Sequence, residues 1–173
     1  MSNRNFDTRI LAEMAIAIAL ATVLSYIKIF SLPFGGSVTL GSMVPILLIA
    51  FRSNVKVGVV TGIIYGFVQM FLDGWFYSPV GMFLDYPLAF GVLGLAGLFK
   101  KQPLVGVVVS LASRFVSHYI SGIVFFGYNA PEGMSPMVYS AVYNGVFMLP
   151  EMVISLILIY LLVKRARVLN INL

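Results

Sequence analysis

Residues 114–126 have the sequence Arg114-Phe-Val-Ser-His118-Tyr-Ile-Ser-Gly122-Ile-Val-Phe-Phe126. The stretch is helical and apolar in pattern, yet it contains an arginine and the only histidine of the chain. Positions 114, 118, 122 and 126 are four residues apart, so they form one stripe along a single helix face. An arginine deep in a membrane helix costs about 2.5–3.5 kcal/mol on insertion scales, so it needs a partner. We predict that this stripe is one wall of a small-molecule site inside a membrane protein.

The composition of the chain excludes an ordinary soluble domain. Apolar residues make up 60% of the 173 residues and charged residues only 10%, whereas soluble proteins are about a quarter charged. The chain has no cysteine, which excludes disulfides and thiolate metal sites. The net charge of +5 does not indicate a nucleic-acid partner, because the basic residues are scattered between apolar runs rather than gathered in a stripe.

The pattern of apolar runs predicts an all-α integral membrane protein that forms a single domain over residues 1–173, with six transmembrane helices. Each run ends at charged residues or at turn-forming glycine and proline, and several approach the ~20 residues needed to cross a bilayer. The predicted helices are residues 10–27, 43–51, 57–72, 80–99, 104–126 and 137–163. The second run is short, and its start is placed between residues 38 and 43. Residues 28–42 are predicted to be a loop.

The basic residues predict the orientation of these helices. Nine of them fall at the two termini or in the second and fourth loops, and only Lys28 falls in a loop on the other side. Because positively charged loops stay in the cytoplasm, both termini are predicted to be cytoplasmic.

Three polar residues on three different predicted helices share one depth in this topology. At about 1.5 Å per residue, Asp85, His118 and Asn144 each lie about seven to nine residues inside the outer surface. Polar groups are costly where they face lipid, so we predict that the three converge on a ligand or on each other. Structural roles remain open for each. Asp85 could cap a broken helix at Pro87 or pair with Arg114, His118 could bond to a backbone carbonyl, and Asn144 could join two helices.

Further residues are assigned around this level. Arg114 lies a turn deeper, where Glu151 on the last helix is in reach, so we predict a buried structural ion pair between them. Aromatic side chains near the same depth suit a flat cationic ligand through stacking and cation–π contacts. They are Tyr86, Tyr119, Phe126, Tyr139 and Tyr143, with Tyr65 and Trp75 as less certain members.

A small-residue face on the first predicted helix is a candidate docking surface. Ala15 and Ala19 are four residues apart, with Ala12 on the same face, and such a face lets another helix approach closely. The partner helix could belong to this chain or to another subunit. The chain contains no phosphate-binding loop and no metal-binding motif, so no metal, cofactor or enzymatic activity is expected.

Several stretches together resemble the thiamin-specific substrate-binding subunits (S components) of energy-coupling-factor transporters, the vitamin-uptake ABC systems of prokaryotes. The resemblance covers nearly the whole chain. Its stretches are residues 35–45 (GGSVTLGSMVP), Leu84-Asp-Tyr86, His118-Tyr-Ile-Ser-Gly122-Ile-Val-Phe-Phe126 with Ala130-Pro131, and Tyr139-Ser-Ala-Val-Tyr-Asn144.

The resemblance implies a six-helix fold that binds thiamin near the outer face. It places the ligand-binding residues at Asp85, Tyr86, His118, Gly122, Phe126, Tyr139 and Asn144. It implies that Ala15 and Ala19 dock on a coupling transmembrane subunit, which works with two ATPase subunits, and that the first outer loop closes over the ligand. Phe126 stands where some relatives carry a tryptophan, and Asp85 where some carry a glutamate.

Two other functions stay open at this point. One is a solitary, proton-coupled secondary transporter that uses Asp85, His118 or Glu151 as a relay, although six helices without an internal repeat are few for alternating access. The other is an S component for a different vitamin, because sister subunits share the fold and differ in the chemistry of their pockets.

Overall fold

The computed structural model describes residues 7–74 and 76–168, and it is helical nearly throughout. Four long helices lie close to their predicted positions: α1 (Thr8–Ser25), α3 (Val55–Asp73), α6 (Pro103–Phe126) and α7 (Pro136–Val168). Side chains that cap two helix N-termini explain where α1 and α3 begin. Asp7 accepts a hydrogen bond from the Ile10 amide (2.8 Å), and Asn54 accepts one from the Val57 amide (3.0 Å).

The predicted helix at residues 80–99 is a composite of four elements. It consists of α4 (Pro79–Phe83), the π-helical turn η3 (Leu84–Leu88), α5 (Ala89–Gly91) and the 3₁₀ segment η4 (Val92–Phe99). Pro87 lies inside the π-helical turn and has no amide hydrogen to donate. Single π-helical turns inside helices are frequent at functional sites, and this one contains Asp85 and Tyr86.

Residues 28–42, predicted to be a loop, contain a short antiparallel hairpin. Strands β1 (Lys28–Ser31) and β2 (Ser37–Thr39) pair Lys28 with Thr39 and Ser31 with Ser37, and the 3₁₀ turn η2 (Pro33–Gly35) joins them. Gly35 has a φ of 100°, which favours glycine. The turn residues were recognised from the sequence, but strands of three and four residues are too short for a visible alternation.

The second predicted helix is a half-length element. Helix α2 (Val44–Arg52) has nine residues, so it is about 14 Å long and too short to cross a hydrocarbon core of about 30 Å. Seven of its nine residues are buried. A short helix is tolerated at membrane depth when protein surrounds it. The hairpin connects the end of α1 to the start of α2.

Five helical segments are long and apolar enough to cross a membrane, namely α1, α3, the composite segment Pro79–Phe99, the α6 region and α7. Only 17% of the α1 segment and 28% of the α7 segment are buried inside the protein. Large apolar side chains such as Ile16, Phe71, Val124 and Leu149 therefore point outward. This surface fits lipid, and the chain is an all-α membrane protein apart from its small hairpin.

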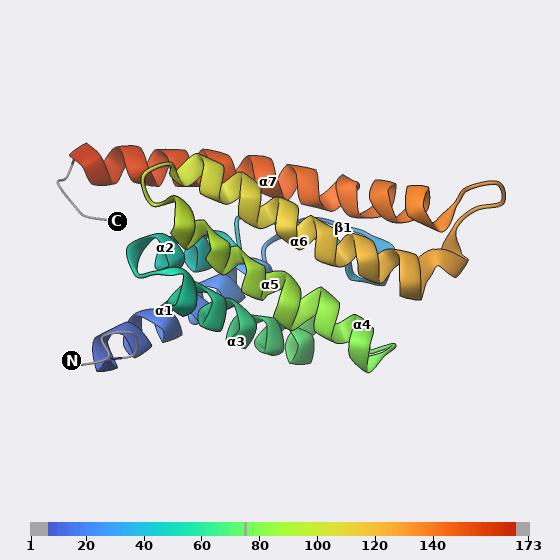
Figure 1. The fold of residues 1–173 in the computed structure, drawn as a ribbon, viewed down its shortest axis with the longest axis horizontal. Helices are drawn as coiled ribbons and strands as arrows, with labels where there is room; N and C mark the ends of the chain where they lie inside the picture. Colours follow the sequence, from blue (N-terminus) through green and yellow to red (C-terminus); the bar gives the residue numbers. More distant parts are fainter. Residues whose placement is uncertain (1–6, 75, 169–173) are drawn as a thin grey trace.

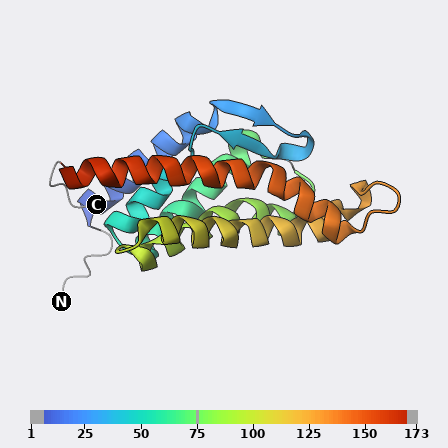
Figure 2. The same cartoon turned by 90° about the horizontal axis from the view of Figure 1, so that it is seen from above.

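The long elements run roughly parallel to one axis (Figure 1). Helices α6 and α7 lie side by side, and the composite segment packs between α6 and α3. Helix α1 lies at the edge, against α2 and α3. The start of α1 and the end of α7 lie at the same end of the molecule, while the hairpin lies along α7 toward the other end (Figure 2).

Glycines allow α3 to approach the composite segment closely. A Cβ atom at Gly62 would lie 2.2 Å from the carbonyl oxygen of Phe90, and one at Gly66 would lie 2.6 Å from that of Tyr86. Small residues four apart are a common means of close helix packing in membranes. Because the atoms in the way belong to the backbone, these contacts fix the position of the π-helical turn that carries Asp85.

We predict that Gly62→Ala destabilises the protein and that Gly145→Ala does not. The added methyl group at position 62 meets a carbonyl oxygen, and such overpacking typically costs about 1–3 kcal/mol. A Cβ atom at Gly145, within α7, meets no atom within 4 Å, and alanine is the better helix former there. Thermal unfolding in detergent should show a lower midpoint for Gly62→Ala alone, and equal midpoints would contradict the packing described.

Candidate functional site

A cavity lies between the hairpin, the composite segment, α6 and α7. Helix α3 and the loop that contains Tyr77 also contribute to its wall. The lining residues are Gly35, Gly36, Ser37, Gln69, Asp73, Tyr77, Asp85, Tyr86, Phe90, Arg114, His118, Gly122, Phe126, Tyr139, Ser140, Tyr143, Asn144 and Phe147. All seven residues predicted to bind ligand are among them, as is Tyr143.

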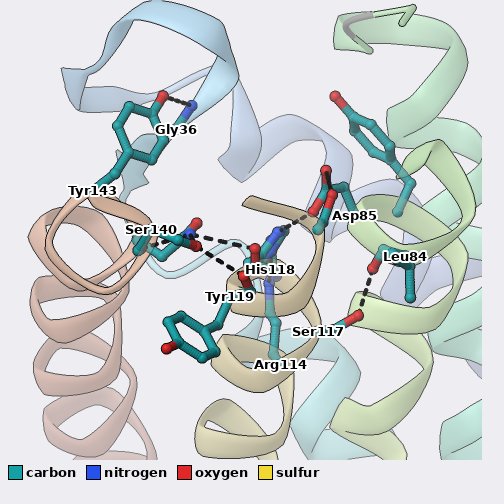
Figure 3. A network of polar contacts seen from close by, with 12 residues as sticks. Gly36, Leu84, Asp85, Arg114, Ser117, His118, Tyr119, Ser140 and Tyr143 are labelled. Atoms are coloured by element: carbon teal, nitrogen blue, oxygen red, sulfur yellow. Dashed lines mark hydrogen bonds and ion pairs between the residues drawn. The ribbon is translucent and has the colours of Figure 1, made fainter. Parts of the chain in front are cut away.

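A chain of hydrogen bonds links Arg114, His118 and Asp85 (Figure 3). The Nε of Arg114 donates to His118 Nε2 at 3.2 Å, and His118 Nδ1 lies 2.8 Å from Asp85 Oδ1. Since Nε2 accepts from Arg114, we assign the imidazole proton to Nδ1, which donates to the carboxylate. His118 and Asp85 are on different spans and are 11% and 17% exposed, so the prediction that they converge is confirmed.

Two hydroxyl groups that were not predicted complete the surroundings of Asp85. Ser121 donates to Oδ2 at 2.7 Å, and Tyr77 donates to the same oxygen. Tyr77 precedes the membrane-spanning segment Pro79–Phe99. Burial is the largest cause, and the negative charge of Asp85 the second largest, of a raised pKa of its phenol. It therefore stays protonated and remains a donor. From the sequence Tyr77 fits an interfacial anchor, but Ser121 could have been found, because it lies three residues after His118 on the same helix face.

The π-helical turn is held from α6 as well. Ser117 Oγ donates to the carbonyl oxygen of Leu84 at 2.6 Å (Figure 3). Within this turn Pro87 has no amide hydrogen to donate, so a bond from outside the helix helps to hold the turn. Ser117 thereby fixes the backbone immediately before Asp85.

Asn144 and Gly122 form the close contact between α6 and α7. The Nδ2 of Asn144 donates to the carbonyl oxygens of Ser140 (2.9 Å) and His118 (3.3 Å), and Ser140 Oγ donates to that of Tyr119 (2.8 Å). A Cβ atom at Gly122 would lie 2.2 Å from Ser140 Oγ. The amide group of Asn144 thus joins the helices, the structural alternative considered above, while the residue also lines the cavity.

The hairpin closes one side of the cavity through Tyr143. The phenol of Tyr143 donates to the carbonyl oxygen of Pro33 and lies 3.4 Å from the amide of Gly36, which donates to it. A Cβ atom at Gly36 would lie 2.8 Å from the ring of Phe147. A larger residue at position 36 would require the ring of Phe147 to shift.

The other predicted aromatic residues divide between wall and core. The ring of Phe126 lies 4.5 Å from that of Tyr77, and the ring of Tyr139 lies 6.0 Å from that of Tyr143. Tyr65 does not line this cavity. It is fully buried, donates to the carbonyl oxygen of Ala21 and packs edge-on against Phe90. It lines a smaller, adjoining cavity instead, so its less certain assignment as a ligand contact stays a prediction. Trp75 lies outside the described residues.

The predicted ion pair between Arg114 and Glu151 is not among the ion pairs found within 4 Å in the described residues. Glu151 Oε1 accepts from the amide (2.5 Å) and the hydroxyl (2.7 Å) of Thr39, so it ties α7 to β2. Arg114 bonds to His118, and its Cζ lies 3.8 Å above the ring of Phe90. Within the described chain, Arg114 Nη1 and Glu151 Oε2 are buried without a hydrogen-bond partner.

Arg114 and Glu151 nevertheless face a common space. Both line a second, smaller cavity that shares Ser37, Gln69 and Asp73 with the first, and Arg114 lines both cavities. The helical rise correctly predicted that the two residues lie at one level. Arg114 also lines the candidate site, as predicted for the stripe of residues 114, 118, 122 and 126.

Ala15 and Ala19 lie on the exposed face of α1. Met14, Ala17 and Ala21 are the buried residues of this helix. The small-residue face therefore points away from the core, and no helix among the described residues covers it.

Comparison with known proteins places this geometry in a family. The family model described as Thiamine transporter protein (Thia_YuaJ) matches residues 11–171. The chain belongs to the thiamine transporter protein family. It is 38% identical to the thiamine transporter ThiT of Bacillus subtilis over 90% of this chain and 91% of the relative. It is 27% identical to ThiT of Lacticaseibacillus paracasei, over 92% and 86%.

A solved structure from the thiamine transporter protein family has the same fold. ThiT from Listeria monocytogenes aligns with a TM-score of 0.81 and 28% identity, and the alignment covers 91% of this chain and 94% of the other. The predicted family is thereby confirmed. Members are transport proteins, so the expectation that the chain is not an enzyme agrees with the family.

We predict that Gly122→Ala destabilises the protein through Ser140. The new methyl group displaces Ser140 Oγ, which loses its bond to Tyr119, and a net loss of about 1 kcal/mol is typical of one hydrogen bond. Ser140→Ala removes the atom in the way, so adding Gly122→Ala to that variant should cost less than adding it to the native protein. A double-mutant cycle on the free energy of unfolding measures this coupling, and fully additive costs would contradict the contact.

Proposed function

We propose that this chain binds thiamin and acts as the substrate-capture subunit of an energy-coupling-factor transporter, with one membrane domain over residues 1–173. The observation that carries the proposal is the charge of the two adjoining cavities. Their walls contain three acids, Asp73, Asp85 and Glu151, and two bases, Lys28 and Arg114. One negative charge is left over, which complements a single positive charge such as that of a thiazolium ring.

The local arrangement supports Asp85 as the residue that reads this charge. Lys28 pairs with Asp73, whereas the donors to Asp85 are an imidazole and two hydroxyl groups. With the imidazole neutral, these donors orient the carboxylate without cancelling its charge. A charge in a poorly hydrated site attracts an opposite charge more strongly than it does in water.

The remaining wall offers surfaces for a flat heteroaromatic ligand. Tyr86, Phe126, Tyr139 and Tyr143 present rings for stacking or cation–π contacts. The Nδ2 of Asn144 is used within the protein, and no bond to its Oδ1 is found among the described residues. That oxygen is available to accept from an amino group of the ligand. We assign substrate binding to these residues together with Asp85, His118 and Gly122.

The distribution of charge supports the orientation. Arg9, Lys101, Lys164 and Arg165 are exposed at the end where α1 begins and α7 ends (Figure 1). We place this end in the cytoplasm of a prokaryote and the cavity near the outer surface.

Cysteine labelling in intact cells tests this orientation, because the chain lacks cysteine. With an impermeant maleimide, Glu132→Cys should react and Arg165→Cys should not. Reaction of Arg165→Cys alone would show the opposite orientation.

Isothermal titration of the purified protein with thiamin tests the binding proposal. We expect saturable binding at one site and a raised unfolding temperature, because a ligand that binds only the folded state stabilises it. A neutral aromatic amine is the matched control ligand and should give neither effect. Absence of heat and of protection with thiamin would contradict the proposal.

The partner proposal concerns the exposed face of α1. We propose that Ala15 and Ala19 dock on a coupling transmembrane subunit that carries two ATPase subunits. Ala15→Trp should abolish ATP-dependent uptake in cells while leaving thiamin binding by the purified chain unchanged. Uptake into vesicles that contain this chain alone, abolished by an uncoupler, would instead identify a solitary proton-coupled transporter.

A further inference from the structure

A third hollow, separate from the two adjoining cavities, lies on the lipid-facing side of the molecule, at the end opposite the candidate site. It is formed where the first turn of α6 lies beside the last third of α7 (Figure 1). Its lining is Gln102, Pro103, Leu104, Val105, Tyr160, Val163 and Lys164. This groove shares no residue with the cavity that contains Asp85.

The groove is apolar along its length and basic at one edge. Leu104, Val105 and Tyr160 are 40%, 43% and 51% exposed although they lie at the depth of membrane helices. Lys164 is the one charged residue of the lining and is exposed, and a lysine side chain can pack its aliphatic stem on apolar surface while its ammonium group stays in a polar environment. The shape therefore fits a molecule with a long apolar part and a polar head.

The basic edge has no carboxylate to neutralise it. Neither α6 nor the part of the chain after Glu151 contains an aspartate or a glutamate. No ion pair among the described residues involves Lys101, Lys164 or Arg165, and Lys100 donates to the backbone carbonyl of Ser53. Several positive charges thus lie near this edge without an ion-pair partner among residues 7–74 and 76–168.

The start of α6 adds to the positive potential there. Pro103 is the first residue of this 24-residue helix, and its cap residue Gln102 makes no side-chain hydrogen bond to the first turn. Amide groups of the first turn and the positive end of the helix dipole favour an anionic group. The uncapped turn and Lys164 lie on the same groove.

We propose that this groove binds one anionic phospholipid, with an acyl chain along Leu104, Val105 and Val163 and the phosphate at Lys164. A zwitterionic lipid fits less well, because its ammonium group would meet Lys100, Lys101 and Arg165. The groove lies on α6 and α7, and α1 lies on the opposite side of the bundle from α7 (Figure 1), so the groove stays accessible to lipid when a partner occupies the exposed face of α1.

Native mass spectrometry of the detergent-solubilised full chain tests the proposal. The probes are phosphatidylglycerol and phosphatidylcholine with identical acyl chains. We expect at least a fivefold preference for one bound phosphatidylglycerol, since one basic side chain near an anionic surface contributes about fivefold. Equal retention of the two lipids by the native protein would by itself overturn the proposal.

Lys164→Gln should reduce the preference about fivefold, and Arg9→Gln is the matched control. Arg9 is exposed at the same end but lies on α1, so its removal changes the net charge equally without touching the groove. An equal loss in both variants would mean that the lysines attract lipid only through overall charge, and the site would be rejected. Displacement of the lipid by the coupling subunit would identify the groove as a protein interface and would also overturn it.

Discussion

The contact between the Asp85 carboxylate and the His118 imidazole is the constraint on which the rest of the site depends. It joins two membrane-spanning segments at 2.8 Å, in surroundings where an unpartnered charge is costly. Every nearby feature serves to hold these two groups. Gly62 and Gly66 bring α3 against the π-helical turn, Ser117 holds that turn from α6, and Arg114 fixes the imidazole from below.

Much of this arrangement could be predicted from the sequence, because membrane helices have a regular rise and the bilayer fixes their ends. Those two facts were enough to bring Asp85, His118 and Asn144 to one level. Depth does not give rotation about the helix axis, however. That is why Arg114 and Glu151, level with one another, were assigned an ion pair, although their side chains bond to His118 and Thr39.

The features missed from the sequence are those that tertiary contacts create. The hairpin is too short to show a period of its own, and β2 is held by Glu151 on a distant helix. Tyr77 lies in a loop, so no helical spacing links it to Asp85. Helix α2 has an apolar run like the others, yet nine residues suffice because protein surrounds it. Local pattern therefore predicted the spans, and packing decided which side chains complete the site.

The central claim is that the negative charge of Asp85 stabilises the positively charged ring of the bound ligand. The most direct test compares Asp85→Asn with the native protein by titration, once with thiamin and once with an analogue whose thiazolium ring is replaced by a neutral ring of the same shape. Asparagine keeps the size of the side chain and removes its charge. The account predicts that affinity for thiamin falls at least tenfold more than affinity for the neutral analogue, about 1.4 kcal/mol. Equal losses for both ligands would contradict it.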